Sequence, residues 1–233
     1  MPIAENAAEQ QLRQEFNRWA EQGRGEEMER HHVPITAPVV ELMQLQPTDK
    51  VLDLSCGAGW ATRLLAKSVP RGTIIGVDLS DQMIAHARES SKQFKNIGYR
   101  VGSAEQIPAE DNSFDKVLSV EAFYYYPDQD RALNELRRVL KPGGNLFILI
   151  NLYKDNAYSL RWVKELAVPV HARSESEYLE LITRHGFTRA AARRIPDPSP
   201  TPDTYSGKWF KDAAELREFK RIGALLLMAT KPG

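Results

Sequence analysis

Two acidic residues at the ends of predicted neighbouring strands are the first sign of chemistry in this sequence. Asp53 lies in the apolar run Val51–Leu54, which passes directly into a turn containing Gly57 and Gly59, and Asp78 follows a β-branched run further along the chain. In a parallel sheet the carboxyl ends of neighbouring strands share one edge, and an acid placed there accepts hydrogen bonds from ribose hydroxyls. The pattern therefore predicts a binding site for a ligand that contains a nucleoside.

The spacing of the glycines separates two kinds of nucleoside ligand. A dinucleotide fingerprint needs a third glycine or alanine three residues after the second glycine, where the helix approaches the sheet beside a pyrophosphate. That position is Thr62, and no Gly-Lys-Ser/Thr sequence of a P-loop occurs. Phosphate recognition is thus poorly supported, and a nicotinamide-dependent reductase is the less favoured interpretation.

The segment around the first acid resembles motif I of the class I S-adenosylmethionine-dependent methyltransferases. That motif is an acid followed by G-x-G-x-G, and it is matched by Asp53, Ser55, Gly57 and Gly59, with serine in place of the first glycine. The resemblance implies that the glycine turn holds the methionine part of S-adenosylmethionine. It also implies that Asp53 orients the amino end of this cofactor and that Asp78 holds its ribose.

The resemblance continues from about residue 51 to residue 150. Residues 102–108 are similar to the family's adenine-binding segment, in which Ser103 stands where an aspartate is common, so that Glu105 or backbone atoms would contact the adenine amine. Residues 112–119 and 136–144 match the family's fourth strand and the helix and turn before its fifth. The cofactor site implied by this resemblance consists of Asp53, Ser55, Gly57, Ala58, Gly59, Asp78, Leu79, Met83, Ser103, Ala104, Glu105 and Val120.

An acid and three tyrosines follow the predicted fourth strand, next to the point where strand order reverses and ligands bind in such sheets. Methyl transfer mainly requires alignment, and a base only if the acceptor arrives protonated. We expect Glu121 to be that base and Tyr124 to assist it, with Tyr125 facing the acceptor. A tyrosine hydroxyl, His31 or His32 are alternative bases. Alternatively, each tyrosine is half-buried packing with its hydroxyl in water.

Residues 1–46 precede the first strand and are predicted to be helical with a break. Apolar residues fall on one helical face, the sequence Gly23-Arg-Gly25 interrupts that face, and Pro38 is suited to begin a second helix. This extension either packs on the sheet or covers the cofactor as a lid. In the lid interpretation, Trp19, His31 and His32 face the ligand.

The predicted fold class is α/β. The chain has 233 residues, of which 42% are hydrophobic, enough for one sizeable domain, which we place at residues 47–233 behind the N-terminal extension. The resemblance implies a seven-stranded, mostly parallel, doubly wound sheet with helices on both faces. Its last strand, within residues 223–230, would be antiparallel and inserted between the fifth and sixth strands.

The composition narrows the classes of partner. Lys plus Arg and Asp plus Glu number 31 each, so the chain offers no bulk positive field for nucleic acid or an anionic membrane. One cysteine and five scattered histidines give no zinc spacing, and no apolar run has transmembrane length. We therefore expect a cytoplasmic protein, monomeric or homodimeric, without a metal.

The interpretation that unites these observations is an S-adenosylmethionine-dependent methyltransferase acting on a small-molecule acceptor. The similarity is greatest to the small-molecule group that includes enzymes of quinone biosynthesis. The alternative from a different class is a protein that binds the cofactor without catalysis.

Overall fold

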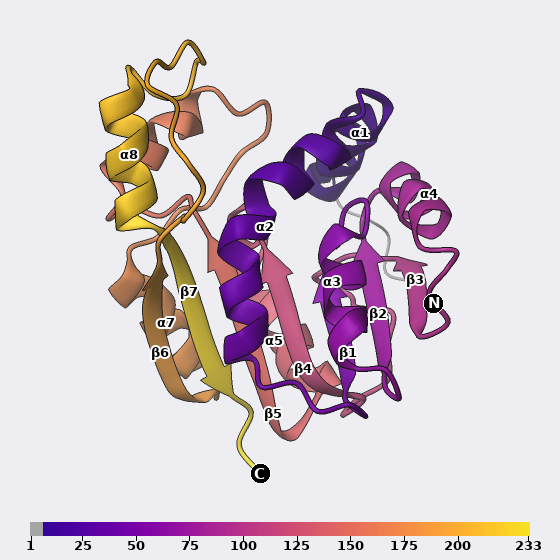
Figure 1. The fold of residues 1–233 in the computed structure, drawn as a ribbon. Coiled ribbons are helices and arrows are strands. Elements are labelled where there is room, and N and C mark those ends of the chain that lie inside the picture. The colour runs from indigo at the N-terminus through magenta and orange to yellow at the C-terminus, as the bar shows by residue number, and fades with distance from the viewer. Residues whose placement is uncertain (1–6) are drawn as a thin grey trace.

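A seven-stranded sheet with the strand order β3-β2-β1-β4-β5-β7-β6 forms the centre of the computed structural model, which describes residues 7–233 (Figure 1). All neighbouring strands pair in parallel except β7, which is antiparallel to both β5 and β6. The predicted fold class and the insertion of the last strand are confirmed. The strands are β1 (Lys50–Leu54), β2 (Thr73–Asp78), β3 (Ile97–Val101), β4 (Phe114–Val120), β5 (Leu140–Ile150), β6 (Thr188–Ile195) and β7 (Ala224–Thr230).

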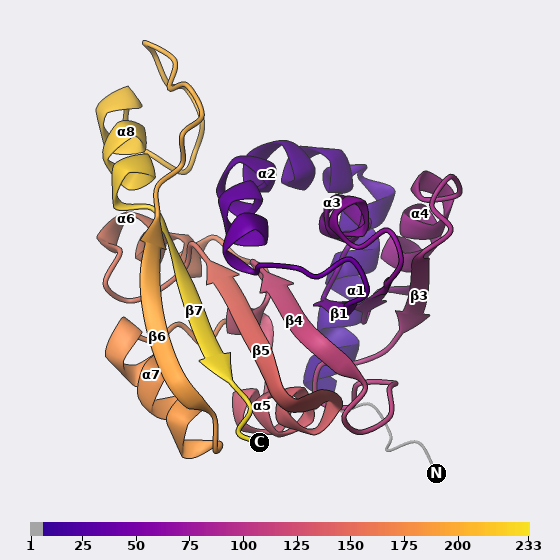
Figure 2. The same cartoon turned by 60° about the horizontal axis from the view of Figure 1, so that its bottom comes forward.

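Helices cover both faces of the sheet, because its central strands are apolar on both sides. Helices α2, α3 and α4 lie on one face, and α5 and α7 lie on the other (Figure 2). The α-helices are α1 (Ala7–Glu21), α2 (Arg24–Leu42), α3 (Trp60–Ser68), α4 (Asp81–Ser90), α5 (Gln129–Val139), α6 (Ala157–Leu160), α7 (Glu175–Arg184) and α8 (Ala213–Ile222). Two short 3-10 helices are η1 (Phe123–Tyr125) and η2 (Arg161–Lys164).

Side-chain caps fix where several helices begin. The Ser80 hydroxyl accepts from the N–H of Met83 at 3.0 Å at the start of α4, and Ser174 forms a reciprocal capping box with Glu177 at the start of α7. Asp128 caps α5 by accepting from the N–H of Arg131 at 2.9 Å. These caps fix the residues at which α4, α5 and α7 begin.

The prediction that Pro38 begins a helix is wrong. Helix α2 begins at Arg24 and runs through both Pro34 and Pro38, and it bends along its length (Figure 1). A proline inside a helix removes one backbone hydrogen bond and kinks the chain. Ile35 and Val39 are nevertheless buried against the sheet, and this tertiary burial outweighs the local preference of the prolines.

The two N-terminal helices have different environments. Helix α2 packs on the sheet in one core cluster with Val51, Ile74 and Leu149. Helix α1 packs on α4 and passes over the carboxyl ends of the first strands, where Leu12 joins the other core cluster (Figure 1). Residues 1–6 of the predicted extension lie outside the described part of the chain. Within residues 7–46, α2 therefore packs on the sheet, whereas α1 lies at the carboxyl ends of the strands.

Strand β5 begins earlier than predicted. The sequence Lys141-Pro-Gly-Gly144 was expected to form a turn before the strand, but the strand already begins at Leu140, with a register shift opposite residues 114–116 of β4. Gly143 has a φ of +78° and its N–H donates to the carbonyl of Lys231 at 2.8 Å. The glycine therefore serves an irregular strand start, because its backbone adopts a conformation that other residues avoid.

Candidate functional site

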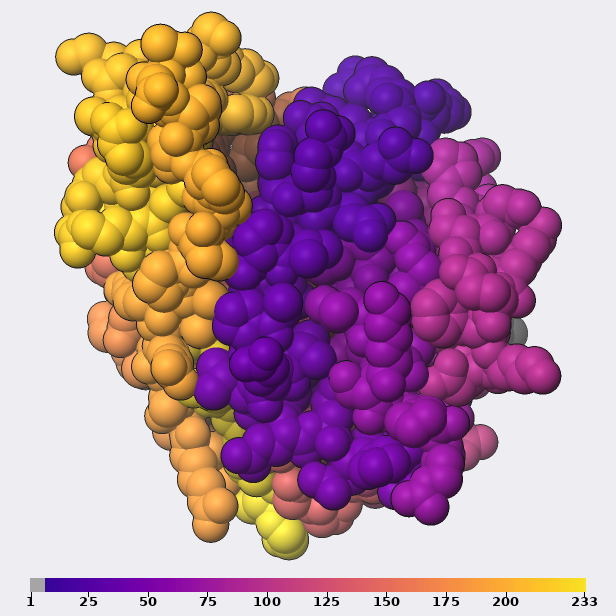
Figure 3. Space-filling view, in the orientation of Figure 1, coloured from indigo at the N-terminus to yellow at the C-terminus, as the bar shows by residue number. Residues whose placement is uncertain are grey.

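A cavity of about 840 Å³ lies at the carboxyl ends of the strands. Its strand-end half is lined by the loops after β1, β2, β3 and β4 and by residues of α1 and α2. Its aromatic half is lined by residues 162–167, by the proline-rich segment around Pro200 and by residues of α8. Figure 3 shows a hollow between the C-terminal segments and the N-terminal helices.

The turn after β1 consists of residues with unusual backbone angles. Ser55, Gly57 and Gly59 have φ values of 60°, 50° and 76°. Ser55, which replaces the first glycine of the motif, thus adopts a conformation that favours glycine. Its hydroxyl forms a hydrogen bond of 2.9 Å with the hydroxyl of Tyr126, an interaction that glycine could not make. Serine at this position therefore adopts a less favourable backbone conformation than glycine would, but its hydroxyl links the turn to the segment after β4.

The two acids occupy the ends of β1 and β2, as the sequence predicted. The carboxylate of Asp78 accepts from the backbone N–H of Gly57 and of Ser80, each at 2.8 Å, so it ties the glycine turn to the start of α4. Asp53 is buried and accepts from the hydroxyl of Thr62 at 2.5 Å. Thr62 is the residue that replaces the third glycine of a dinucleotide fingerprint, and the structure gives it a role in holding an acid.

Burial raises the pKa of both acids. The pKa of Asp53 rises to about 7, chiefly through burial, with a further contribution from the negative charge of Asp78. Burial also raises the pKa of Asp78, although the N–H groups of Ser80 and Gly57 oppose the shift. The ionised forms of these two buried acids are therefore destabilised. A cationic or hydroxyl-bearing ligand that donates hydrogen bonds to them would stabilise those forms.

The loop after β3 carries a second group of polar contacts. Glu105 is buried, and its Oε1 accepts from the N–H of Asp128 at 2.8 Å, while its Oε2 has no hydrogen-bond partner within the described chain. The Ser103 hydroxyl accepts from the N–H of Glu105 at 2.9 Å and donates to the carboxylate of Glu9 on α1. Glu9 was not among the predicted site residues, because no sequence motif connects α1 with this loop.

Glu121 follows β4 in a left-handed conformation, with a φ of 55°. Its carboxylate accepts from the N–H of Asn151 at 2.5 Å and from the hydroxyl of Tyr124 at 3.0 Å. Burial raises the pKa of Glu121 to about 7 and raises that of Tyr124 well above its usual value. A carboxyl with a pKa near neutrality, held by two donors, is suited to exchange a proton with a ligand.

Tyr126 holds two strand ends together, a role that distinguishes it from the other two tyrosines after β4. Its hydroxyl lies between the hydroxyl of Ser55, at 2.9 Å, and that of Ser119, at 3.1 Å, and so connects the ends of β1 and β4. Because it is the third of three consecutive tyrosines, composition alone could not distinguish it from Tyr124 and Tyr125.

Residues of the N-terminal helices cover the strand-end half. The ring of Trp19 lies edge-on to that of Tyr125, with centroids 6.4 Å apart, and its indole N–H donates to Glu15 at 2.6 Å. His31 lines the cavity, and His32 packs on Trp60 with ring centroids 6.2 Å apart. Burial, assisted by the neighbouring His31, lowers the pKa of His32 to about 4.

Helix α2 approaches the glycine turn very closely. A Cβ added to Gly25 would lie 2.8 Å from the Cβ of Ala58. Arg63 strengthens this contact by donating to the carbonyl of Ala58 and to the carboxylate of Glu29, each at 2.9 Å. Gly25 is therefore a packing residue inside α2, whereas the predicted break is confined to residues 22–23 between the two helices.

The structure brings the predicted site residues together. All of those named from the sequence line the cavity, apart from Gly59. Gly59 lies at the N-cap of α3, and a Cβ there would overlap the hydroxyl of Tyr99, so its position is explained by close packing. The individual roles assigned to the lining residues remain predictions.

The aromatic half was not predicted as a unit. Trp162 packs against Phe219 and Trp209, with ring centroids 5.3 Å and 5.8 Å apart, and Phe210 lies 4.9 Å from Phe219. The indole N–H of Trp162 is buried and has no hydrogen-bond partner within residues 7–233. The rings come from segments about 50 residues apart in the sequence, and only their high aromatic content could have drawn attention to them.

Within residues 7–233, no group of three or more His, Cys, Asp or Glu side chains is arranged to hold a metal ion. No helix in this range is long and apolar enough to cross a membrane.

Comparison with known sequences identifies relatives over much of the chain. Residues 52–148 match a family described as a methyltransferase domain. The demethylmenaquinone methyltransferase of Staphylococcus carnosus is 36% identical over 149 residues, which make up 60% of this chain and 61% of that protein. An uncharacterized methyltransferase of Schizosaccharomyces pombe is 34% identical over 171 residues, 70% of this chain and 59% of that protein. The chain thus spans about three fifths of the length of these relatives.

Comparison with solved structures extends the similarity to nearly the whole chain. A candidate methyltransferase of Haloferax volcanii, solved in complex with the Trm112 methyltransferase activator, superimposes with a TM-score of 0.88 and is 30% identical. The match covers 94% of this chain and 98% of that one. An Aquifex aeolicus methyltransferase, with a TM-score of 0.61 and 21% identity over 86% of this chain and 92% of that one, shares the fold.

Proposed function

Because the chain belongs to the class I S-adenosylmethionine-dependent methyltransferases, we propose that it transfers the methyl group of S-adenosylmethionine to a small-molecule acceptor. The observation that carries this proposal is the single cavity that joins the polar strand ends to an aromatic wall. It has one region suited to a nucleoside and another suited to an apolar acceptor.

The residues of the strand-end half fit the cofactor. Asp78 would accept from ribose hydroxyls, and its existing bonds to two backbone N–H groups hold it in place for that role. Gly57 has no atom within 4 Å of an added Cβ, so the turn leaves open space for the methionine part of the cofactor. The negative charge around Asp53 suits an amino group. Bound S-adenosylmethionine supplies a methyl group activated by a sulfonium.

The chain's own residues contribute alignment and proton acceptance. Positioning of two reacting groups can supply roughly 7 to 11 kcal/mol of barrier reduction. Glu121 would take a proton from an acceptor that arrives protonated, and the Tyr124 hydroxyl and the Asn151 N–H hold its carboxylate in position. A pKa of about 7 suits this task, because the group is then both partly ionised and sufficiently basic near neutral pH.

The acceptor that we propose is an apolar molecule with a flat ring. Support comes from the rings of Trp162, Trp209 and Phe219 on one side of the cavity. The indole N–H of Trp162, which has no partner among the described residues, would donate to an oxygen on such a ring. The activity named for the Staphylococcus carnosus relative, on demethylmenaquinone, is of the same chemical class.

Calorimetry and a labelled-methyl assay test this proposal. We expect binding of S-adenosylmethionine and its demethylated product, S-adenosylhomocysteine, and none of NAD. We also expect transfer of label to aromatic or quinol-type small molecules. Binding without transfer to any acceptor would favour a non-catalytic binding protein, and preferential binding of NAD would favour a reductase.

We further propose that the chain functions with a protein partner. The support is its 30% identity over nearly its whole length to the Haloferax volcanii protein solved with the Trm112 activator. Co-expression with a Trm112-type protein and size-exclusion chromatography test this idea. Co-elution and increased transfer are expected, whereas separate elution at micromolar concentration would contradict it.

A further inference from the structure

Ser55 begins the glycine turn after β1 in a strained backbone conformation. Its φ is 60°, in the left-handed region that glycine enters freely and that a Cβ disfavours. A residue other than glycine persists there only when its surroundings hold it in place. The conformation of the turn therefore depends on contacts that Ser55 makes with other parts of the chain.

On the side of β2, backbone groups hold the turn. The N–H of Cys56 donates to the carbonyl of Val77 at 3.0 Å, and the N–H of Gly57 donates to the carboxylate of Asp78 at 2.8 Å. These bonds fix the two residues that follow Ser55. Ser55 itself is held from the opposite side of β1, by a contact that involves β4.

On the side of β4, a side chain continues the connection where the strand pairing stops. The last paired residues of β1 and β4 are Leu54 and Ser119, one position before Ser55. The hydroxyl of Tyr126 lies 2.9 Å from the Ser55 hydroxyl and 3.1 Å from the Ser119 hydroxyl, so it bridges the two strand ends one step beyond the ladder. Without this bridge, Ser55 would keep its disfavoured conformation with no side-chain support.

The bridging hydroxyl is itself fixed in place. Tyr126 and Ser119 are both buried, and the ring of Tyr126 packs edge-on against Phe123 with centroids 5.4 Å apart. Burial raises the pKa of Tyr126 to about 12, so the hydroxyl keeps its proton near neutral pH and can donate one hydrogen bond while accepting another. A phenylalanine at this position would keep the ring contact and lose only the bridge.

We infer that Tyr126 is a positioning residue for the cofactor, which acts through Ser55 by keeping the glycine turn in the conformation that binds the methionine part. This inference rests on the proposed function. The serine at position 55 and the tyrosine at position 126 together provide what a glycine at position 55 provides alone. Without the bridge, part of the population leaves the binding conformation, and the measured affinity falls by the fraction that remains competent.

Calorimetry with S-adenosylhomocysteine provides the test. We expect Tyr126→Phe to weaken binding by about 5- to 20-fold, the effect of losing one buried hydrogen bond and leaving its partner unpaired. Ser55→Ala, which keeps a Cβ and removes the hydroxyl, should weaken binding to a similar extent. Ser55→Gly should weaken it less than Ser55→Ala does, because glycine adopts the left-handed conformation without support.

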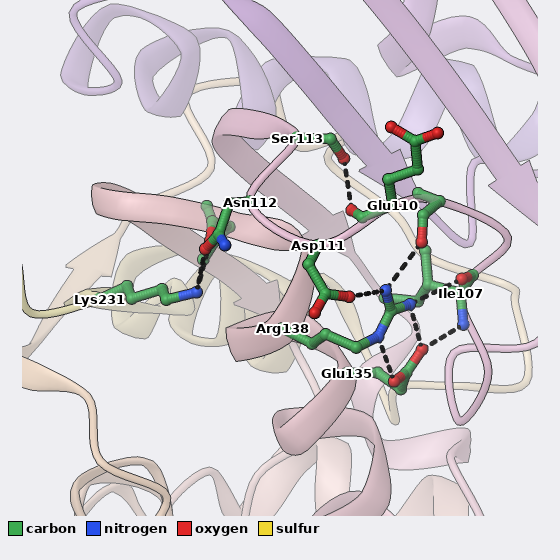
Figure 4. A network of polar contacts seen from close by, with 10 residues as sticks. Ile107, Glu110, Asp111, Asn112, Ser113, Glu135, Arg138 and Lys231 are labelled. Atoms are coloured by element: carbon green, nitrogen blue, oxygen red, sulfur yellow. Dashed lines mark hydrogen bonds and ion pairs between the residues drawn. The ribbon is translucent and has the colours of Figure 1, made fainter.

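The double variant Ser55→Gly/Tyr126→Phe separates positioning from a general structural role. With glycine at position 55, the Tyr126→Phe substitution should change the affinity by less than about twofold, because the bridge has nothing left to hold. The matched control is Ser113→Ala, which removes a hydroxyl bond of 2.8 Å to the carbonyl of Glu110, beside the polar network of Arg138 and outside the cavity (Figure 4). This variant should bind the ligand as the wild type does.

Two results would overturn the inference while leaving the proposed function in place. One is a loss on Tyr126→Phe that is absent with serine at position 55 or equally large with glycine there. The other is an equal loss in Ser55→Gly and Ser55→Ala, which would show that the serine hydroxyl acts on the ligand directly, and this comparison remains decisive even if Tyr126→Phe does not fold. Thermal unfolding of each ligand-free variant shows whether it is folded. If the wild type did not bind S-adenosylhomocysteine at all, the proposed function would fall together with the inference.

Discussion

The two halves of the cavity are built from different kinds of contact. In the strand-end half, carboxylates such as Asp78 and Glu121 are fixed by backbone N–H groups at 2.5 to 2.8 Å. In the aromatic half, rings pack on one another with centroids 4.9 to 5.8 Å apart. Sites built from hydrogen bonds reject analogues that lack the matching group much more strongly than apolar pockets reject a change of shape. The comparison therefore predicts strict selection of the cofactor and broader tolerance toward the acceptor.

The largest effect is expected at Glu121, in the strand-end half. Glu121→Gln should lower turnover by about 10²- to 10⁴-fold, the usual contribution of a general base, while leaving cofactor affinity nearly unchanged. Radiolabelled methyl transfer and calorimetry measure these quantities separately. The control is Glu165→Gln, which changes an exposed acid elsewhere on the cavity. Normal turnover in Glu121→Gln would remove this residue from the reaction.

The next effect concerns the cofactor alone. Asp78→Asn should weaken binding of S-adenosylhomocysteine by roughly 10- to 100-fold, because it removes charge-assisted hydrogen bonds both to the ribose and to the glycine turn. The KM for the acceptor should change little. Asp81→Asn, at the exposed first residue of α4, is the control. A larger change in the acceptor KM than in cofactor affinity would contradict the division of the cavity into two halves.

The pH dependence gives a smaller effect. Because the pKa of Glu121 is raised from 4.5 to about 7, the basic form is lost below neutrality, and kcat/KM should increase about tenfold between pH 6 and pH 8. Asp53 titrates in the same range, so cofactor affinity must be measured at each pH. The profile of residual activity in Glu121→Gln should lose this step, and a step that persists there would assign it to another group.

The raised pKa values of Asp53 and Glu121 also make the stability of the fold decrease as the pH rises. Each holds its proton more tightly in the folded chain than in the unfolded one, so each contributes stability that is present below about pH 4 and lost as the pH rises to about 7. Thermal unfolding should show a smaller loss of stability over this range in Asp53→Asn than in the wild type. An equal loss in both would show that Asp53 does not titrate with a raised pKa.

The smallest effect is expected in the aromatic half. Trp162→Leu should raise the acceptor KM by a few-fold to about tenfold, since it removes ring contacts and one N–H donor. It should also widen the range of acceptors, because shape is the main basis of selection there. Cofactor affinity should remain unchanged. Sharper rather than broader acceptor selection would show that the comparison between the halves is wrong.

The strand-end half could be predicted from sequence because its chemistry is local. Asp53, the glycine turn and Asp78 lie on consecutive elements, and the order of the elements alone brings them together. Glu9 could not be predicted, because it reaches the cavity from a helix whose placement depends on tertiary packing. The error at Pro38 has the same origin: local backbone preference predicted a helix start, whereas burial on the sheet continued the helix through the proline.

Gly25 of α2 and Ala58 of the glycine turn approach each other so closely that the space between them holds only one methyl group. The side chain of Ala58 occupies that space. A side chain at position 25 would lift the first turns of α2 and, with them, the histidines that cover the cavity. The absence of a side chain at position 25 thus allows α2 to pack closely on the glycine turn after β1.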